Sequence, residues 1–196
     1  RPQAPGGLEV RDLAGPGLRA PVSFQVARGE VVGFSGLVGA GRTELMRLIC
    51  GATAPTAGDV RVRGATIRGG SPRAAIQEGL VFCPEDRKKE GIIGIRSVAE
   101  NINLSARRTH LRASLFLNLS WERANAANQI ARLGVRTASA ETLIGLLSGG
   151  NQQKAILARW LSEDVRVLVL DEPTRGIDVG AKSEIYALIH DLAAAG

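Results

Sequence analysis

Apolar and polar residues alternate along several short stretches in the first third of the chain. Residues 8–11, 22–26 and 59–64 show this period of two, which is typical of strands that bury one face. A Gly-Pro-Gly turn at 15–17 separates the first two stretches. We therefore expect these two strands to form an antiparallel flank at one side of a sheet.

Three other stretches are almost entirely apolar and predict strands that are buried on both faces. They lie at 31–35, 80–82 and 167–170. Strands without polar alternation are typical of parallel sheets whose two faces are covered by helices. Together with the alternating stretches, they predict an α/β fold.

Helical periodicity fills the intervals between these strands. Between residues 98 and 147 it predicts a block of helices that interrupts the sheet and forms a subdomain of its own. The last helix carries His190, which we expect to be exposed or satisfied and not catalytic. The expected helices are 43–49, 72–78, 98–104, 121–133 with Ser120 as its N-cap, one that begins within 147–154 and runs to about Leu161, and a last one with Ile185, Leu188, Ile189 and Leu192 on one stripe.

Composition narrows the class of protein. The chain has 196 residues, of which 44% are hydrophobic, and this is the size of about one globular domain. It contains no run of 18 apolar residues, no secretory segment and only two cysteines, so we expect a cytosolic protein. The net charge is +6, but the basic residues are scattered and no aromatic platform accompanies them, so we expect no nucleic-acid partner.

The glycine-rich stretch at 36–43, GLVGAGRT, joins the first buried strand to a helix. Such a turn directs several backbone N–H groups to one point, and its glycines leave room for phosphate oxygens. The spacing matches the phosphate-loop pattern G-x-x-x-x-G-K-[ST], except that Arg42 replaces lysine. Thr43 would then bring its hydroxyl to a phosphate-bound Mg²⁺. By itself the stretch is equally consistent with an ordinary glycine turn.

Polar residues also stand where other elements begin or end. Ser148 and two glycines open a helix and make either a second anion site or an ordinary cap. Asp171 and Glu172 follow the strand at 167–170, where paired carboxylates are costly unless they hold a cation or act on a water. The charged run 85–91 follows the strand at 80–82, and it is either an exposed loop or part of a ligand site.

In their order and spacing, these segments resemble the ATP-binding domain of ABC transporters, over nearly all of residues 8–195. The stretch 36–43 is similar to the Walker A motif, and 147–152 to the signature motif, written LSGGN in place of LSGGQ. The stretch 167–172 is similar to Walker B with its catalytic glutamate, and Asp178 to the D-loop aspartate. This combination favours the phosphate loop over the ordinary turn.

The chain further resembles the second ATPase half of bacterial monosaccharide importers of the ribose, galactose and xylose type. GLVGAGRTEL, EDRKKEG, IGLLSGGNQQK and DEPTRGIDVGAKSEIY carry this resemblance. In that family the second half has arginine in Walker A and glutamate in the loop facing the membrane subunit, and Arg42 and Glu85 match both departures. The resemblance implies a first half before Arg1, and a further strand, tail and switch histidine after Gly196.

The resemblance implies a P-loop NTPase core with a mostly parallel central sheet, an antiparallel β flank and an inserted α-helical subdomain. Residues 1–7 would be a linker, 8–84 and 148–196 the ATP-binding core, and 85–147 the loop and helical subdomain, to which the signature helix from 149 also belongs.

The implied cofactors are ATP and Mg²⁺, and the implied site residues divide by role. Glu172 would polarise the attacking water, Thr43 and Asp171 would hold Mg²⁺ with Glu85 nearby, and Asp178 would be the D-loop residue. The ATP phosphates would be bound by Gly36, Leu37, Val38, Gly39, Ala40, Gly41, Arg42 and Thr43, and the ATP of the opposing half by the signature residues Ser148, Gly149, Gly150, Asn151 and Gln152.

The implied function is ATP hydrolysis that powers monosaccharide import at the cytoplasmic face of the plasma membrane. The partners would be the first ATPase half, the transmembrane permease subunits and, indirectly, a sugar-binding protein. A regulatory half that hydrolyses little, or an ABC ATPase that does not transport, are the alternatives. We expect the chain alone to be nearly inactive. We also expect the run 85–91 to couple nucleotide state to the permease, and single substitutions at Arg87 or Lys88 to do little.

Overall fold

A computed structural model describes residues 7–113 and 115–195. The described residues fall into two compact units. The first is formed by the chain up to Phe82, by Val165–Asp171 and by the residues from Ile189 onward, and the second by Cys83–Asp164 and Glu172–Leu188. The linker expected at 1–7 lies outside the described residues except for Gly7.

The first unit is built on a four-stranded antiparallel sheet in the order β2-β1-β3-β4. Its strand β1 (Leu8–Ala14) buries Leu8 and Val10, as the alternation predicted, and also Leu13, which follows a register shift. The antiparallel flank is therefore confirmed. The other strands are β2 (Val22–Val26), β3 (Ala57–Val62) and β4 (Ala65–Ile67).

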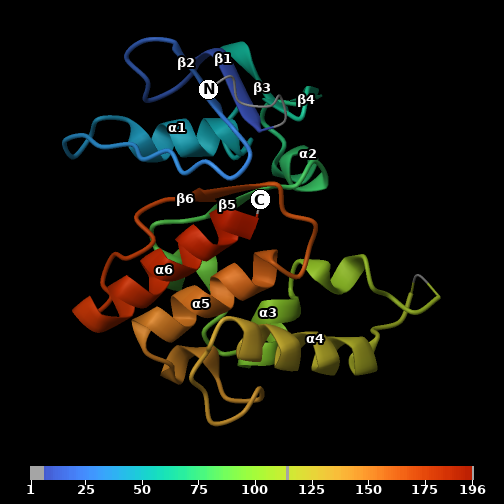
Figure 1. Cartoon of the computed structure of the whole chain (residues 1–196). Helices are drawn as coiled ribbons and strands as arrows, with labels where there is room; N and C mark the ends of the chain where they lie inside the picture. The colour runs from blue at the N-terminus through green and yellow to red at the C-terminus, as the bar shows by residue number, and fades with distance from the viewer. Residues whose placement is uncertain (1–6, 114, 196) are drawn as a thin grey trace. The chain divides into compact units, whose positions relative to one another are not determined.

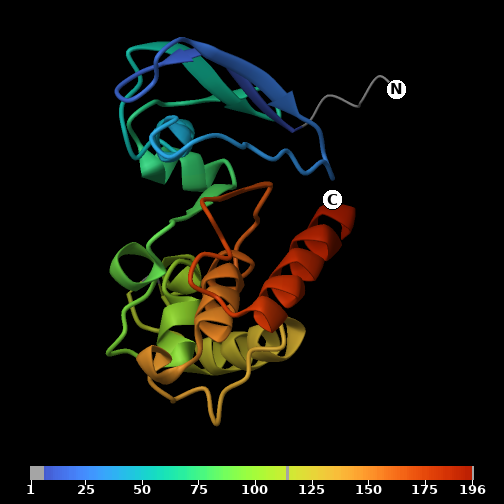
Figure 2. The ribbon, with the colours of Figure 1, turned by 90° about the vertical axis from the view of Figure 1, so that its left-hand side faces the viewer.

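Helix α1 (Arg42–Ile49) lies along one face of this sheet (Figures 1 and 2). It buries Leu45, Met46, Leu48 and Ile49 in the same apolar cluster as the inward side chains of β1 and β3. This burial is the main force that holds the N-terminus of α1 in place behind the glycine-rich stretch.

A second sheet has two strands, β5 (Leu80–Cys83) and β6 (Val167–Leu170), and all of their residues except Cys83 belong to the first unit. Helix α2 (Pro72–Gln77) precedes β5 and begins at Ser71, whose hydroxyl accepts a hydrogen bond from the Ala74 amide. β5 is largely buried, whereas only Val169 of β6 is. The expectation that β6 is buried along its whole length was therefore wrong.

The strand expected at 31–35 is not formed in the described structure. Val31, Val32 and Phe34 are 54%, 39% and 36% exposed, and a side chain on Gly33 would meet no atom within 4 Å. A strand buried on both faces needs hydrogen-bonding partners at its edges, and among the described strands none pairs with this segment. The segment is attached through Phe34, whose ring meets Phe24 edge to face with centroids 5.0 Å apart.

The second unit is helical. Helix α3 (Val98–Asn103) contacts both α4 (Leu119–Arg132) and α5 (Gly149–Trp160). Short 3₁₀ turns at Ala106–Arg108 and Ile144–Leu146 precede α4 and α5, and the last helix α6 (Val179–Ala195) contributes its residues up to Leu188. The helical character predicted for residues 98–147 is confirmed.

Helix starts in this unit depend on side-chain caps. At α3, Ser97 and Glu100 form a reciprocal capping box, and its hydrogen bonds lower the pKa of Glu100. At α4 the expected cap was wrong: Asn118, not Ser120, accepts the hydrogen bond from the Trp121 amide. Ser120 lies inside the first turn and donates to Asn118 Oδ1 at 2.9 Å.

In the part of the chain that the structure describes, none of the helices combines the length and the apolar character that crossing a membrane requires.

Candidate functional site

The glycine-rich stretch forms a tight turn in front of α1. The Ala40 amide donates to the Leu37 carbonyl at 3.1 Å, and Leu37 and Val38 are 85% and 98% exposed. Gly39 and Gly41 have φ values of 79° and 84°, which glycine adopts without strain. Gly41 is the N-cap of α1 and supplies no side-chain acceptor to the first amides of the helix. This uncapped N-terminus is therefore suited to an anion.

Asp171 directly follows β6 and is buried, with 6% of its surface exposed. Its Oδ2 atom is buried without a hydrogen-bond partner among the described residues. An unpaired carboxylate oxygen is costly to bury, and a cation or a cation-bound water would satisfy it. This atom therefore fits Mg²⁺, and Thr43, the second residue of α1, fits the role of a further oxygen ligand.

No group of three or more His, Cys, Asp or Glu residues that could hold a metal ion occurs within 7–113 and 115–195.

Glu172 is exposed and has a left-handed backbone, with φ of 44°. The next residues fold back in a turn in which the Arg175 amide donates to the Glu172 carbonyl at 2.9 Å. Left-handed conformations are sparsely populated by residues other than glycine, and they concentrate at functional sites. The side chain of Arg175 forms an ion pair with Glu85, and this contact ties the residue expected near the metal to the Glu172 turn.

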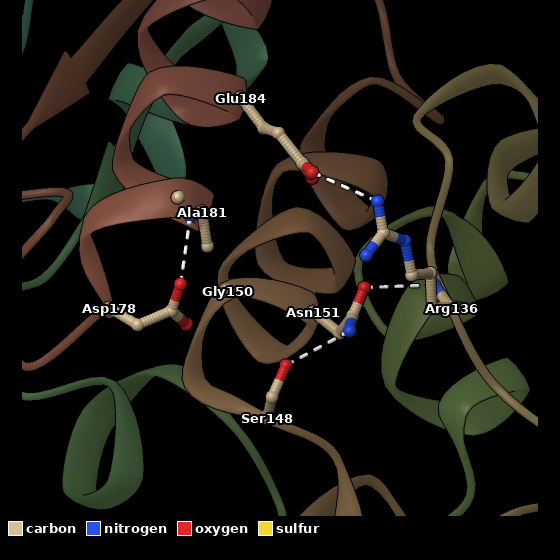
Figure 3. Close-up of a pocket in the computed structure, with 8 residues that line it drawn as sticks. Arg136, Ser148, Gly150, Asn151, Asp178, Ala181 and Glu184 are labelled. Carbon is tan, nitrogen blue, oxygen red and sulfur yellow. Dashed lines mark hydrogen bonds and ion pairs between the residues drawn. The ribbon is translucent and has the colours of Figure 1, made fainter.

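The signature residues open helix α5. Ser148 is the N-cap, but its side chain does not cap the helix. Asn151 Nδ2 donates to Ser148 Oγ at 2.9 Å, and Asn151 Oδ1 accepts from the Arg136 amide at 2.8 Å (Figure 3). Gln152 is buried, and its amide donates to the carbonyls of Ile144 and Leu147. The signature therefore forms one hydrogen-bonded unit with the segment before it.

A hollow of about 180 Å³ lies between the start of α5 and the start of α6 (Figure 3). Asp178 Oδ1 accepts from the Ala181 amide at 2.9 Å, so the expected D-loop aspartate also caps the first turn of α6. The hollow is lined by Arg136, Ser148, Gly150, Asn151, Asp178, Gly180, Ala181 and Glu184.

Glu184 at the edge of this hollow is held by two cations. Lys154 Nζ donates to Glu184 Oε2 at 2.7 Å and to the Gly134 carbonyl at 3.1 Å. Arg136 Nη2 lies 3.0 Å from Glu184 Oε1. The hydrogen bond from Lys154 lowers the pKa of the Glu184 carboxyl, and the nearby charge of Arg136 adds to this. Glu184 therefore stays ionised at neutral pH and compensates the nearly buried Lys154.

Sequence reasoning did not find the contacts of Arg87. Its guanidinium donates to the carbonyls of Arg175 at 2.5 Å and Gly176 at 3.0 Å, and to Gln152 Oε1 at 3.3 Å. These acceptors lie 65 to 89 residues after Arg87 in the sequence, and no local pattern indicates them. Arg87 also begins a five-residue π-helical turn, Arg87–Gly91, where we expected either an exposed loop or a ligand site. The prediction that its substitution does little assumed an exposed side chain, whereas Arg87 is only partly exposed and Lys88 is exposed.

A second arginine with long-range hydrogen bonds, Arg159 of α5, is buried. Its Nε donates to the Asn101 carbonyl at 2.8 Å, and its Nη2 donates to Asn101 Oδ1 at 3.2 Å. Burial lowers the pKa of Arg159 and raises the pKa of the neighbouring Cys83 thiol to about 12. Cys83 is therefore a protonated packing residue at neutral pH, and it is not a nucleophile.

The glycine-rich turn before α1, the LSGGN start of α5 and the carboxylates after β6 follow one another along the chain in the order typical of a nucleotide-binding cassette. A family model described as ABC transporter matches residues 20–175, and the chain belongs to this family.

Among its curated relatives is the arabinose import ATP-binding protein AraG 2 of Burkholderia thailandensis, which is 58% identical over the whole chain. The arabinose import ATP-binding protein AraG of Pseudomonas savastanoi pv. phaseolicola is 59% identical over 96% of it. The alignments span 38% and 37% of the two relatives' own lengths. The chain therefore corresponds to less than two fifths of these proteins.

Solved structures confirm the α/β fold of an ABC cassette. A nucleotide-free ATP-binding cassette from an ABC transporter superposes with a TM-score of 0.80 at 22% identity, over 97% of this chain and 78% of that one. A dimeric cassette in a post-hydrolysis state with ADP and Pi gives 0.76 at 20% identity, over 95% and 82%. At these identities the likeness establishes the fold alone.

Proposed function

We propose that this chain is the ATP-binding and ATP-hydrolysing part of a bacterial monosaccharide importer. The observation that carries the proposal is that the buried Oδ2 of Asp171 has no hydrogen-bond partner among the described residues, in a chain of the ABC transporter family. A protein keeps such an atom at a cost of about 1–3 kcal/mol, and binding of a magnesium–nucleotide complex offsets that cost. The arabinose importers among the relatives support a monosaccharide as the transported molecule.

The residues divide the work at the nucleotide. The turn at 36–43 binds the ATP phosphates with backbone amides in front of α1, while Thr43 and Asp171 hold Mg²⁺, directly or through water. When bound, Mg²⁺ neutralises phosphate charge during phosphoryl transfer. Glu172 orients and polarises the attacking water. Its exposed position and left-handed backbone support this role, because they place the carboxylate outside the packed strand.

The signature acts on a second nucleotide. Ser148, Gly149 and Gly150 face the ATP bound by the first ATPase half of the same polypeptide, and Asn151 and Gln152 support them. Asp178 lies where the two halves meet. The hollow beside Ser148 and Asp178 supports this arrangement because it offers amide and hydroxyl donors around a helix N-terminus.

The permease subunits are the proposed membrane partners. An exposed apolar patch in the second unit supports this: Ile93, Ile95, Leu143 and Leu146 are 42%, 82%, 46% and 77% exposed. Backbone hydrogen bonds join their two segments, from the Ile144 amide to Arg96 and from the Gly145 amide to Gly94. Exposed apolar side chains on neighbouring segments are typical of protein interfaces. The chain would then lie at the cytoplasmic face of the membrane as a peripheral subunit, with a sugar-binding protein acting indirectly.

One observation favours a second candidate function. Arg42 occupies the phosphate-loop lysine position, and its planar fork differs from a compact ammonium. A regulatory half that binds ATP and hydrolyses little would carry such a change.

The test is ATP turnover by the complete transporter in vesicles, with its sugar-binding protein and arabinose, ribose, xylose or galactose. For an active half, Glu172→Gln lowers sugar-stimulated turnover by at least about half and abolishes uptake, because hydrolysis at its own site is lost. For a regulatory half, the same substitution leaves turnover unchanged. Turnover that no monosaccharide stimulates would overturn the import function itself.

A further inference from the structure

Arg87 connects three segments of the helical unit through one side chain. Its Nη1 and Nη2 atoms donate to two consecutive carbonyls, those of Arg175 and Gly176, at 2.5 and 3.0 Å. Its Nε donates to Gln152 Oε1 at 3.3 Å. All three acceptors are neutral oxygens, so the guanidinium binds backbone and amide groups at fixed positions.

The acceptors are themselves anchored. Gln152 Nε2 donates to the carbonyls of Ile144 and Leu147, so its Oε1 is held in place beside the signature. Arg175 closes the turn that begins at Glu172, through its amide, and its side chain pairs with Glu85. Gly176 lies two residues before Asp178. The guanidinium therefore bridges the Glu172–Asp178 segment and the first turns of α5.

The packing around Gly149 shows how close this bridge lies to the signature. A Cβ atom on Gly149 would come within 2.5 Å of Arg87 Nη2 and 3.1 Å of the Gly176 carbonyl oxygen. A side chain at this position would therefore displace the Arg87 guanidinium from its present place. Only a planar, three-pronged donor can satisfy two successive carbonyls and an amide oxygen together, and a lysine ammonium cannot reproduce that geometry.

We propose that Arg87 is a positioning residue that holds the turn carrying Glu172 and Asp178 in a fixed place relative to the signature helix. Through it, the hydrolytic carboxylate of one nucleotide site and the signature offered to the other site keep one relative position. The proposal rests on the proposed function for its catalytic consequence, whereas the clamp itself is a property of the fold.

The clamp is tested first without any activity. Hydrogen–deuterium exchange on the full-length protein compares wild type with Arg87→Met, with Arg123→Met as the control at an exposed arginine of α4 in the same unit. In Arg87→Met we expect amides of 172–178 and 148–152 to exchange at least about tenfold faster, because hydrogen bonds that restrain the two segments are lost. Amides of α4 should not change, and Arg123→Met should resemble wild type. Unchanged exchange at 172–178 in Arg87→Met would overturn the clamp.

The catalytic consequence is tested in the complete transporter. Arg87→Met should lower kcat by about tenfold to a hundredfold, the usual penalty for misplacing a catalytic group by about 1 Å. The KM for MgATP should stay within about twofold, because Arg87 is outside the phosphate-binding turn. Arg87→Lys should recover little, whereas added guanidinium ion should partly restore Arg87→Ala and methylammonium should not.

The outcomes separate this inference from the proposed function. If ATP hydrolysis by the wild-type transporter does not depend on Glu172, the proposed function is wrong. The hydrogen–deuterium exchange result still tests the clamp in that case. Normal kcat in Arg87→Met together with active wild type overturns the positioning role. A rise in KM equal to the loss in kcat/KM, or full rescue by lysine, also overturns it, because either result would make Arg87 a source of binding or of charge alone.

Discussion

Gly150 of α5 and Ala181 of α6 lie so close that a Cβ atom on Gly150 would stand 2.7 Å from the Cβ of Ala181. Helix packing therefore requires the second signature glycine, whatever nucleotide the signature meets.

A methyl group at Gly150 should destabilise the fold. Gly150→Ala forces α5 and α6 apart, and overpacking of this kind costs about 1–3 kcal/mol. The measurement is the free energy of unfolding of the chain without nucleotide. Gly180→Ala is the control, because a Cβ there meets only Asp178 Oδ1 at 3.6 Å; it should leave stability unchanged or raise it by up to about 1 kcal/mol. Equal effects of the two substitutions would contradict the packing argument.

Replacing Asp171 should improve stability and remove function. Asp171→Asn exchanges a buried unpaired carboxylate oxygen for a neutral amide, so we expect the free energy of unfolding without nucleotide to rise by about 1 kcal/mol. Calorimetry of the complete protein should show weaker binding of MgATP at this site, because the metal loses an anionic ligand. A less stable Asp171→Asn protein would mean that the carboxylate is needed for the fold and not for a cation.

Arg42→Lys tests the departure in the phosphate loop. If the guanidinium weakens the local site, lysine should tighten MgATP binding in the full-length protein by about tenfold, which corresponds to about 1.4 kcal/mol. Isothermal calorimetry measures this, with Arg47→Lys in the last turn of α1 as a matched control. Unchanged or weaker affinity would show that arginine serves the site as well as lysine.

The Glu184 carboxylate should make stability depend on pH. Its pKa is lowered below the ordinary value of 4.5 by Lys154, so its contribution is fully present above the unfolded pKa and is lost as the pH falls through the folded pKa. Glu184→Gln should therefore lower the melting temperature at pH 7, and the difference from wild type should shrink as the pH falls below about 4.5. A difference that is constant from pH 7 to pH 3 would count against the ion pair as its source.

The exposed part of the charged run tests coupling to the permease. Lys88→Ser with Lys89→Ser leaves Arg87 in place, so nucleotide binding should remain intact while transport and the stimulation of ATP turnover by the permease fall. Single exposed charges contribute only about 0–1 kcal/mol, and for this reason both are changed together. Normal sugar uptake at equal expression would reduce these two lysines to a solvated surface.

Much of the fold could be predicted from local sequence patterns. The alternation at 8–11, the apolar stripe of α1 and the helical block were predictable because each depends on residues close in sequence. The stretch at 31–35 was mispredicted, because an apolar run forms a strand only where another strand pairs with it. The expected site residues could be placed on their elements from motif spacing.

The contacts that organise these residues were not predictable in the same way. Arg87 reaches acceptors 65, 88 and 89 residues away. The sequence of a densely charged run does not indicate which of its side chains will contact distant segments. Whether Oδ2 of Asp171 has a hydrogen-bond partner depends on which groups the fold places beside it. The helix begins at Leu119, so Asn118 is its N-cap and Ser120 already lies in its first turn.

Asn151 in the LSGGN sequence determines the direction in which the Ser148 hydroxyl can donate its hydrogen bond. The Arg136 amide can only donate, so the Asn151 oxygen must face it and the Asn151 NH₂ group must face Ser148. Ser148 Oγ is then the acceptor in that contact, and its own hydrogen is directed elsewhere. The backbone amide of Arg136, twelve residues before Ser148, thus leaves the Ser148 hydroxyl as a donor toward any oxyanion that approaches the start of α5.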